Sequence, residues 1–214
     1  MAIQLLELRI GRAQVHQGAH GAPWTSAIGK QPCRQPVWIT RTGLQGDEVA
    51  HPDVHGGPDQ AVLAYASEHY PRWKAEGVPA GPGDFGENLL LAGLTDQDAC
   101  IGDTFALGEA VLQVSHPRQP CNTLVKRFGR KDIVSLVWSL ARGGWYMRVL
   151  REGWIEPGLA MTLLDRINPG GTVARVLTAF DQAVKQPEEA AAAADLAGLT
   201  LAWSRKLREK AGIA

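Results

Sequence analysis

The sequence lacks an excess of charge of either sign, because its 22 lysine and arginine residues balance its 22 aspartate and glutamate residues. A general nucleic-acid surface needs a basic excess, so we expect no nucleic-acid partner. Long apolar runs are also missing: none approaches the roughly 18 residues that cross a bilayer. The opening stretch MAIQLLELRI alternates like a strand, without the basic head and cleavage site of a signal peptide. We therefore expect a cytoplasmic protein with no membrane contact.

Cysteine is scarce, and its spacing excludes two kinds of site. The three residues, Cys33, Cys100 and Cys121, are odd in number and widely separated. This pattern fits neither a disulfide framework nor a zinc site, and it indicates reduced thiols in a reducing compartment. The chain also lacks the glycine fingerprint of a flavin domain and the cysteine set of an iron–sulfur cluster.

What the sequence does have, up to about residue 165, is a series of short strand-like segments with glycine-rich turns. The candidates are IQLLELRI, PVWIT, QAVLAYA, NLLL, TFALGEAVLQVS, WYMRVLREG and AMTLLDR. The turn in ALGEA, centred on Gly108, predicts a hairpin. Two helices are predicted between the strands, one from Ser67 to Gly77 and one from Asp132 to Gly143. This pattern predicts a mostly-β fold, a β-barrel with a few short helices, rather than a parallel sheet.

The sequence pattern changes from strand-like to helical after residue 165. Three short helices are predicted, opening at Thr172, at Pro187 and at Thr200. Threonine is a good helix N-cap, and proline is favoured at the first helical position. The chain is therefore predicted to consist of a β-barrel domain over residues 1–165 and a three-helix domain over residues 166–214.

Three polar loops precede or interrupt the predicted strands. SAIGK offers the hydroxyl of Ser26 and the ammonium of Lys30, although the same stretch also fits a solvated surface loop. FGENLLL places Asn88 at the mouth of an apolar strand, where its amide can both donate and accept hydrogen bonds. The neighbouring Glu87 suits an acid–base role or a purely structural one.

The loop AHPDVHGGPDQ combines histidine and glycine. His51 and His55 are four residues apart, but the prolines and glycines around them forbid the helix that would put both rings on one face. A zinc site is therefore not favoured. Gly56 and Gly57 allow backbone amides to approach an anion beside His55. A plain turn into the next strand is the alternative.

The stretch SHPRQPCNTL raises the sharpest question, because a thiol stands among polar residues. Cys121 follows a proline and lies three residues after Arg118. A guanidinium can hold an oxyanion with two hydrogen bonds. A nearby cation also lowers the pKa of a thiol and favours the thiolate, which is a nucleophile and a soft metal ligand. A structural cysteine is the alternative.

Taken together and in order, SAIGK, GLQGD, HGGPDQAV, FGENL, IGD and QVSHPRQPC resemble the MOSC domain, named from the C-terminus of molybdenum-cofactor sulfurase. The resemblance runs from about residue 5 to 165 and is closest to the YiiM branch, linked to resistance to 6-N-hydroxylaminopurine. The three C-terminal helices look like the helical appendage of that branch.

The resemblance implies a barrel that binds a molybdenum–pyranopterin cofactor, independent of pyridoxal phosphate. Cys121 then matches the cysteine that ligates molybdenum. The other cofactor contacts it implies are Arg118, His55, Gly56, Gly57, Asn88, Lys30 and Ser26. The implied activity is reduction of N-hydroxylated compounds, such as hydroxylaminopurines and other hydroxylamines, to amines. Electrons would come from an external flavin or ferredoxin-type donor, because the chain has neither cofactor signature.

Two other hypotheses stay open at the level of sequence. In the first, the barrel holds or transfers the cofactor without turnover, since one fold hosts several functions. In the second, Cys121 works without metal as a persulfide carrier or nucleophile. That chemistry requires a base paired with the thiol, for which His116 and His55 are the candidates.

Overall fold

A computed structural model describes residues 2–18, 21–52 and 55–213 of the chain. Its strands are β1 (Ile3–Ile10), β2 (Gln14–Gly18), β3 (Gly21–Ser26), β4 (Gln31–Cys33), β5 (Val37–Thr40), β6 (Gly43–Leu44), β7 (Val62–Ala66), β8 (Leu89–Ala92), β9 (Thr104–Leu107), β10 (Ala110–Pro117), β11 (Trp145–Arg151), β12 (Gly153–Ile155) and β13 (Ala160–Asp165). Its helices are the 3-10 helix η1 (Pro58–Gln60), α1 (His69–Ala75), α2 (Asn122–Phe128), α3 (Ile133–Leu140), α4 (Val173–Asp181), α5 (Pro187–Ala194) and α6 (Leu201–Ala211).

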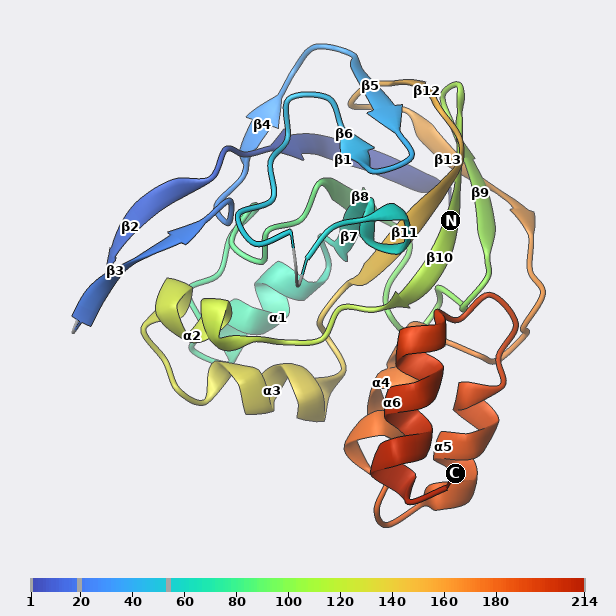
Figure 1. Cartoon of the computed structure of the whole chain (residues 1–214). Coiled ribbons are helices and arrows are strands. Elements are labelled where there is room, and N and C mark those ends of the chain that lie inside the picture. Colours follow the sequence, from blue (N-terminus) through green and yellow to red (C-terminus); the bar gives the residue numbers. More distant parts are fainter. Residues whose placement is uncertain (1, 19–20, 53–54, 214) are drawn as a thin grey trace.

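Seven strands close into a barrel (Figure 1). They follow the order β13-β9-β10-β11-β7-β8-β1, and β1 pairs back onto β13, with Ile3 opposite Met161. Strands β7 and β8 run parallel to each other, whereas the other pairs around the barrel are antiparallel. The predicted mostly-β barrel is confirmed. Closure pairs the edges that an open sheet would leave exposed.

The barrel interior is filled by alternate residues of its strands. On β10, Ala110, Leu112 and Val114 are buried while the residues between them are partly exposed, as the period of two in a strand requires. Fully burying one such aliphatic side chain contributes about 1.5–3 kcal/mol. The apolar alternation that predicted the strands therefore also supplies the core.

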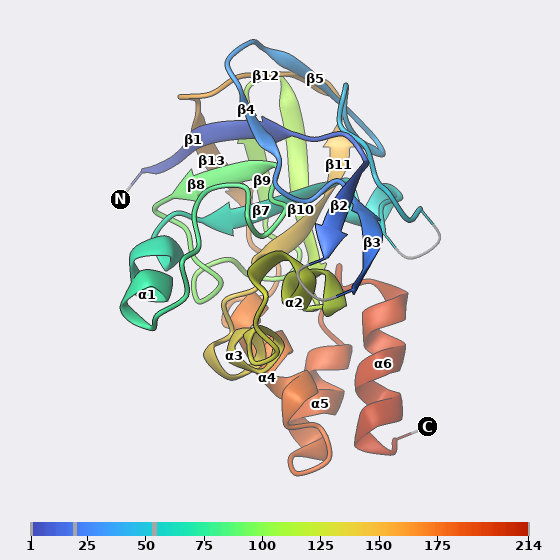
Figure 2. The ribbon, with the colours of Figure 1, turned by 90° about the vertical axis from the view of Figure 1, so that its left-hand side faces the viewer.

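The three C-terminal helices lie together against one end of the barrel (Figures 1 and 2), with their predicted starts confirmed. Thr172 caps α4 by accepting a hydrogen bond from the Arg175 amide (3.1 Å), and Thr200 caps α6 by accepting one from the Trp203 amide (3.3 Å). Pro187 opens α5. The buried apolar core is continuous between these helices and the barrel. The domain boundary at residue 165 stays a prediction.

The structure differs from the sequence prediction in the short elements. Helix α1 begins at His69 rather than at Ser67. A helix that was not predicted, α2, begins directly after Cys121, and Gly129 ends it in the left-handed conformation (φ 64°). Only Leu124 is buried along α2, so the apolar signal for this helix is weak. The hairpin of β2 and β3, which extends from the barrel in Figure 1, also lacked an apolar alternation. No helix in the described part of the chain is long and apolar enough to span a membrane.

Candidate functional site

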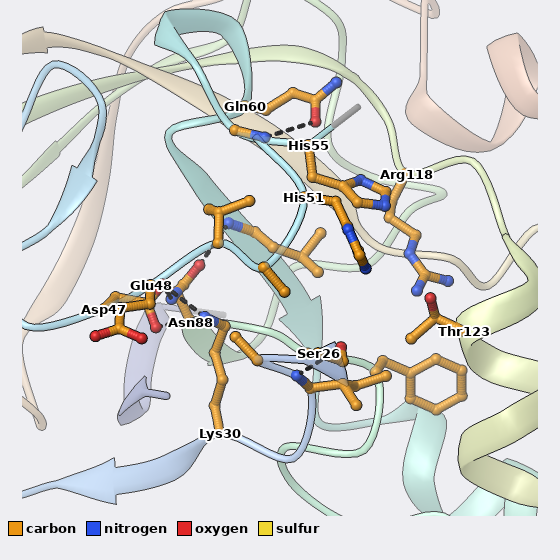
Figure 3. A pocket seen from close by; sticks show the side chains of 18 of the residues that line it. Ser26, Lys30, Asp47, Glu48, His51, His55, Gln60, Asn88, Arg118 and Thr123 are labelled. Carbon is orange, nitrogen blue, oxygen red and sulfur yellow. Dashed lines mark hydrogen bonds and ion pairs between the residues drawn. The ribbon is translucent and has the colours of Figure 1, made fainter. Parts of the chain in front are cut away.

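Loops at one end of the barrel enclose a cavity that we call the Cys121 cavity (Figure 3). They are the segments after β3, β6 and β10 and the segments that lead into β7 and β8. Of the eight residues predicted to contact a cofactor, seven line this cavity: Ser26, Lys30, His55, Gly56, Asn88, Arg118 and Cys121. The eighth, Gly57, faces a neighbouring hollow. The chain thus brings together residues that lie up to 95 positions apart, from 26 to 121. Their roles stay predictions.

Cys121 occupies the N-cap position of α2 and is half-buried. Burial by itself raises the pKa of the Cys121 thiol. The neighbouring His55 side chain and the positive charge of Arg118 oppose that effect, and the polar groups of Thr123 add to them. The net result is a pKa lowered to about 6, so the thiolate predominates at neutral pH. The thiol therefore has the ionisation state of a nucleophile or a metal ligand.

Arg118 follows β10 and is only 6% exposed. Its backbone amide donates to the carbonyl of Gly144 (2.9 Å), which fixes the start of the side chain. Among the described residues, the buried Nη1 atom has no hydrogen-bond partner. A buried donor without a partner is costly, and the cost is greater for a charged group. An anionic ligand bound in the cavity would supply the missing acceptor.

The opposite end of the cavity is built around Asp47. This carboxylate pairs with the ammonium of Lys30 and accepts a hydrogen bond from the side-chain amide of Asn88 (2.8 Å) and from the backbone amide of Gly11 (2.7 Å). The Asn88 carbonyl oxygen in turn accepts from the Leu63 amide (3.2 Å). The polar groups at this end are thus paired with one another.

The histidine-glycine loop reaches the cavity from the side of Arg118. Figure 3 shows the rings of His51 and His55 beside each other and next to the Arg118 side chain. His51 Nε2 is 3.1 Å from the carbonyl oxygen of Thr25, and His55 contributes to the lowered pKa of the thiol. The Gly56 amide donates to Oε1 of Gln60 (3.3 Å). This amide is therefore already engaged within the loop.

Gly57 and Ser26 have local structural roles in addition to their predicted ones. Gly57 precedes η1 with a φ of 85°, a conformation that favours glycine. Ser26 ends β3, and its hydroxyl accepts a hydrogen bond from the Ile28 amide (3.1 Å), which shapes the turn toward Lys30.

The cavity residues that the sequence did not identify as site residues include Asp47, Gln60, Thr123 and Tyr146. Asp47 lies in the GLQGD motif, and its pairing with Lys30 was the available signal, since a buried lysine requires a carboxylate partner. Thr123 stands two residues after the thiol in the first turn of α2, a helix that the sequence did not predict. Gln60 and Tyr146 carry no local signal, because only the fold brings η1 and β11 to Cys121.

The thiolate and the unpaired guanidinium lie at the same end of the cavity, and this proximity defines the chemistry that it supports. A soft sulfur donor suits a soft metal, and a buried guanidinium suits a phosphate or another oxyanion. The other two cysteines are elsewhere: Cys33 lies on β4, and Cys100 pairs with Thr172 next to the C-terminal helices. Cys121 is therefore the thiol of this cavity.

Comparison with known proteins gives a consistent result. The family model of the MOSC domain matches residues 51–162. The chain is 44% identical over 170 residues to the protein YflK of Bacillus subtilis (strain 168), which covers 79% of this chain and 76% of that one. It is 42% identical over 177 residues to a protein of Gibberella moniliformis named "Reductase", which covers 80% of this chain but 31% of that protein.

Among solved structures, the chain is similar to the crystal structure of YiiM from Geobacillus stearothermophilus. The two superpose with a TM-score of 0.81 at 30% sequence identity, over 98% of this chain and 99% of that one. This similarity extends through the three C-terminal helices, in agreement with the resemblance to the YiiM branch inferred from the sequence. The chain belongs to the MOSC domain family.

Proposed function

We propose that this protein binds a molybdenum–pyranopterin cofactor in the Cys121 cavity and reduces N-hydroxylated compounds to amines. The observation that carries the proposal is the lowered pKa of Cys121 beside a buried guanidinium with an unpaired nitrogen. Such a pair fits a ligand that has both a soft metal and an anionic group. The reductase name of the Gibberella relative supports an oxidoreductase role.

The residues present fit such a cofactor at one end of the cavity. Cys121 would provide the protein's sulfur ligand to the metal, and the Nη1 atom of Arg118 would donate to an anionic group of the cofactor. His55 and Thr123 lie beside the sulfur in the cavity wall and favour its thiolate form. Polar groups beside a metal ligand orient it and tune its donor strength. When bound, the cofactor supplies two-electron redox chemistry, which protein side chains lack.

The overall reaction consumes two electrons and two protons. An N-hydroxylated substrate R–NHOH becomes R–NH₂ and one water molecule as the N–O bond breaks. We propose that the electrons come from an external flavin or ferredoxin-type donor protein. His55 is placed to deliver a proton, because its ring lies in the same cavity wall as Cys121.

A second candidate function is a carrier role, in which the barrel binds the cofactor without turnover or Cys121 carries sulfur as a persulfide. The same lowered pKa favours it, because a thiolate is the reactive form in sulfur transfer. Turnover with an artificial electron donor distinguishes the two candidates.

The decisive experiment measures molybdenum per chain in protein produced in cells with an intact cofactor pathway. The wild type is compared with Cys121→Ser, and Cys33→Ser is the matched control outside the cavity. We expect near-stoichiometric metal in the wild type and in the control, with loss of most metal in Cys121→Ser. The loaded protein should then reduce aryl hydroxylamines with a chemical reductant. Equal molybdenum in all three proteins would refute the ligand assignment.

A further inference from the structure

A second cavity adjoins the first on the side of the C-terminal helices. Its wall includes Cys121 and His55, which also line the Cys121 cavity, together with His116, Gln119, Trp203 and Lys206. We call it the α6 cavity, because Trp203 and Lys206 belong to α6. Cys121 therefore stands in a wall that two cavities share.

The α6 cavity has a volume of about 300 Å³ and reaches the same thiol from the side of the C-terminal helices. A ligand held by Arg118 in the Cys121 cavity leaves the α6 cavity open to a second molecule, because Arg118 does not line it.

Aromatic rings form one wall of the α6 cavity. The His116 ring lies 5.2 Å from the Tyr146 ring and 6.1 Å from the Trp203 ring, centroid to centroid. His116 and Trp203 are each only 3% exposed, so the row presents edges rather than open faces to the cavity. The Nδ1 atom of His116 has no hydrogen-bond partner among the described residues. A ligand with a heterocyclic or amide edge would supply the missing hydrogen bond.

The charged side chain at the α6 cavity, Lys206, is positive. The exposed ammonium of Lys206 lies 6.0 Å from the Trp203 ring and donates to Oε1 of Gln119 (3.0 Å). This bond joins α6 to the segment that bears Cys121. No carboxylate is found among the described residues that line the cavity. The nearby Asp59 is neutralised by Arg148 (2.7 Å). The cavity thus favours neutral or anionic ligands over cationic ones.

We propose that the α6 cavity is the substrate subsite, which accepts a flat aromatic N-hydroxylated compound with an anionic substituent directed at Lys206. The identity of the reacting group rests on the proposed function, whereas the preference for a flat anion does not. In this arrangement a polar edge of the ring hydrogen-bonds Nδ1 of His116. The N–O group points toward Cys121 through the shared wall. The C-terminal helices thereby determine specificity.

The first test uses metal-free full-length protein and needs no turnover. Two aryl maleimides, one with a para-carboxylate and one with a para-trimethylammonium group, alkylate Cys121 in a Cys33→Ser background, and intact mass gives each rate. We expect the carboxylate reagent to react faster. Lys206→Glu should lower the ratio of the two rates by about fivefold, as expected from a change of two charges near the ligand. Arg205→Glu, an exposed neighbour on the same helix, makes the same charge change and should leave the ratio near that of the wild type.

The second test uses the molybdenum-loaded protein and the corresponding pair of aryl hydroxylamines. Lys206→Glu should raise KM for the carboxylated substrate severalfold and leave kcat and the molybdenum content unchanged. The subsite is refuted if Lys206→Glu and Arg205→Glu change the maleimide ratio equally, or if neither changes it. Selective alkylation without turnover would overturn the reductase and leave the subsite standing. Turnover that is insensitive to Lys206→Glu would overturn the subsite and leave the reductase standing.

Discussion

The two ends of the Cys121 cavity differ in whether their polar groups are paired with one another. At the Asp47 end, the carboxylate, the lysine and the asparagine satisfy one another. At the Cys121 end, a thiolate and a buried guanidinium stand together, and Nη1 of Arg118 has no partner in the described part of the chain. Polar groups that are mutually paired stabilise the fold, whereas unpaired ones cost stability and are available to a ligand. The comparison therefore separates the frame of the cavity from its binding groups.

The largest effect is expected at the paired end. Asp47→Ala would leave the buried Lys30 ammonium without its counter-charge and would remove the acceptor for Asn88 and Gly11. Breaking a buried ion pair by removing one partner costs roughly 3–5 kcal/mol. We expect a loss of unfolding free energy of that size in urea titrations. The control is Glu48→Ala, which removes an exposed neighbouring carboxylate and should cost less than about 1 kcal/mol. Equal losses in the two variants would contradict the distinction.

Removal of the guanidinium at the unpaired end should act on binding instead. Arg118→Met deletes a buried charge with an unsatisfied nitrogen, so the free energy of unfolding should stay constant or rise by about 1 kcal/mol. Cofactor retention should fall by about 10–100-fold, the range expected when a charged hydrogen bond is lost. Molybdenum and pterin are measured after dialysis, beside a urea titration. A large fall in unfolding free energy with full cofactor retention would show that Arg118 is structural.

A smaller effect is expected in the pH dependence of Cys121 alkylation, which also tests the Cys121 end of the cavity. The folded pKa of Cys121 is lowered to about 6, so its alkylation by iodoacetamide in metal-free protein should rise through pH 6 and level off by about pH 7. A free thiol, with a pKa of about 8.5, would still gain rate above pH 8. His55→Ala should move the midpoint of Cys121 to higher pH. An alkylation midpoint near pH 8.5 in the wild type would mean that Cys121 is not a thiolate at neutral pH.

The strand alternation and the helix caps made the larger elements predictable from sequence. Alternating apolar residues located the barrel strands, and Thr172, Pro187 and Thr200 located the C-terminal helices. The same local signals failed for α2, because a helix that buries one side chain has no apolar stripe to detect. Long amphipathic elements can be predicted from the local sequence. Short surface elements cannot, because they depend on contacts that only the fold provides.

The candidate site was predictable as a set of residues but not as an arrangement. The motifs and the family resemblance identified seven residues that line one cavity. They did not indicate that Asp47 neutralises Lys30, or that the thiol is shared with a cavity under α6. Both facts depend on contacts between segments far apart in the chain, for which no spacing rule exists.

The pairing of β1 with β13 also determines when the protein can fold during its synthesis. On the edge of β1 that faces away from β8, Leu8 to Ile10 pair with β4, but Ile3 and Gln4 remain without a partner until the ribosome has produced β13, because they pair with Met161 and Ala160. At about 5–20 residues per second, that interval lasts roughly ten to thirty seconds. Throughout it, Leu5 and Leu8 lack part of the core that later buries them. The nascent chain thus carries an unpaired strand edge, and cells that make this protein must keep that edge from joining another chain.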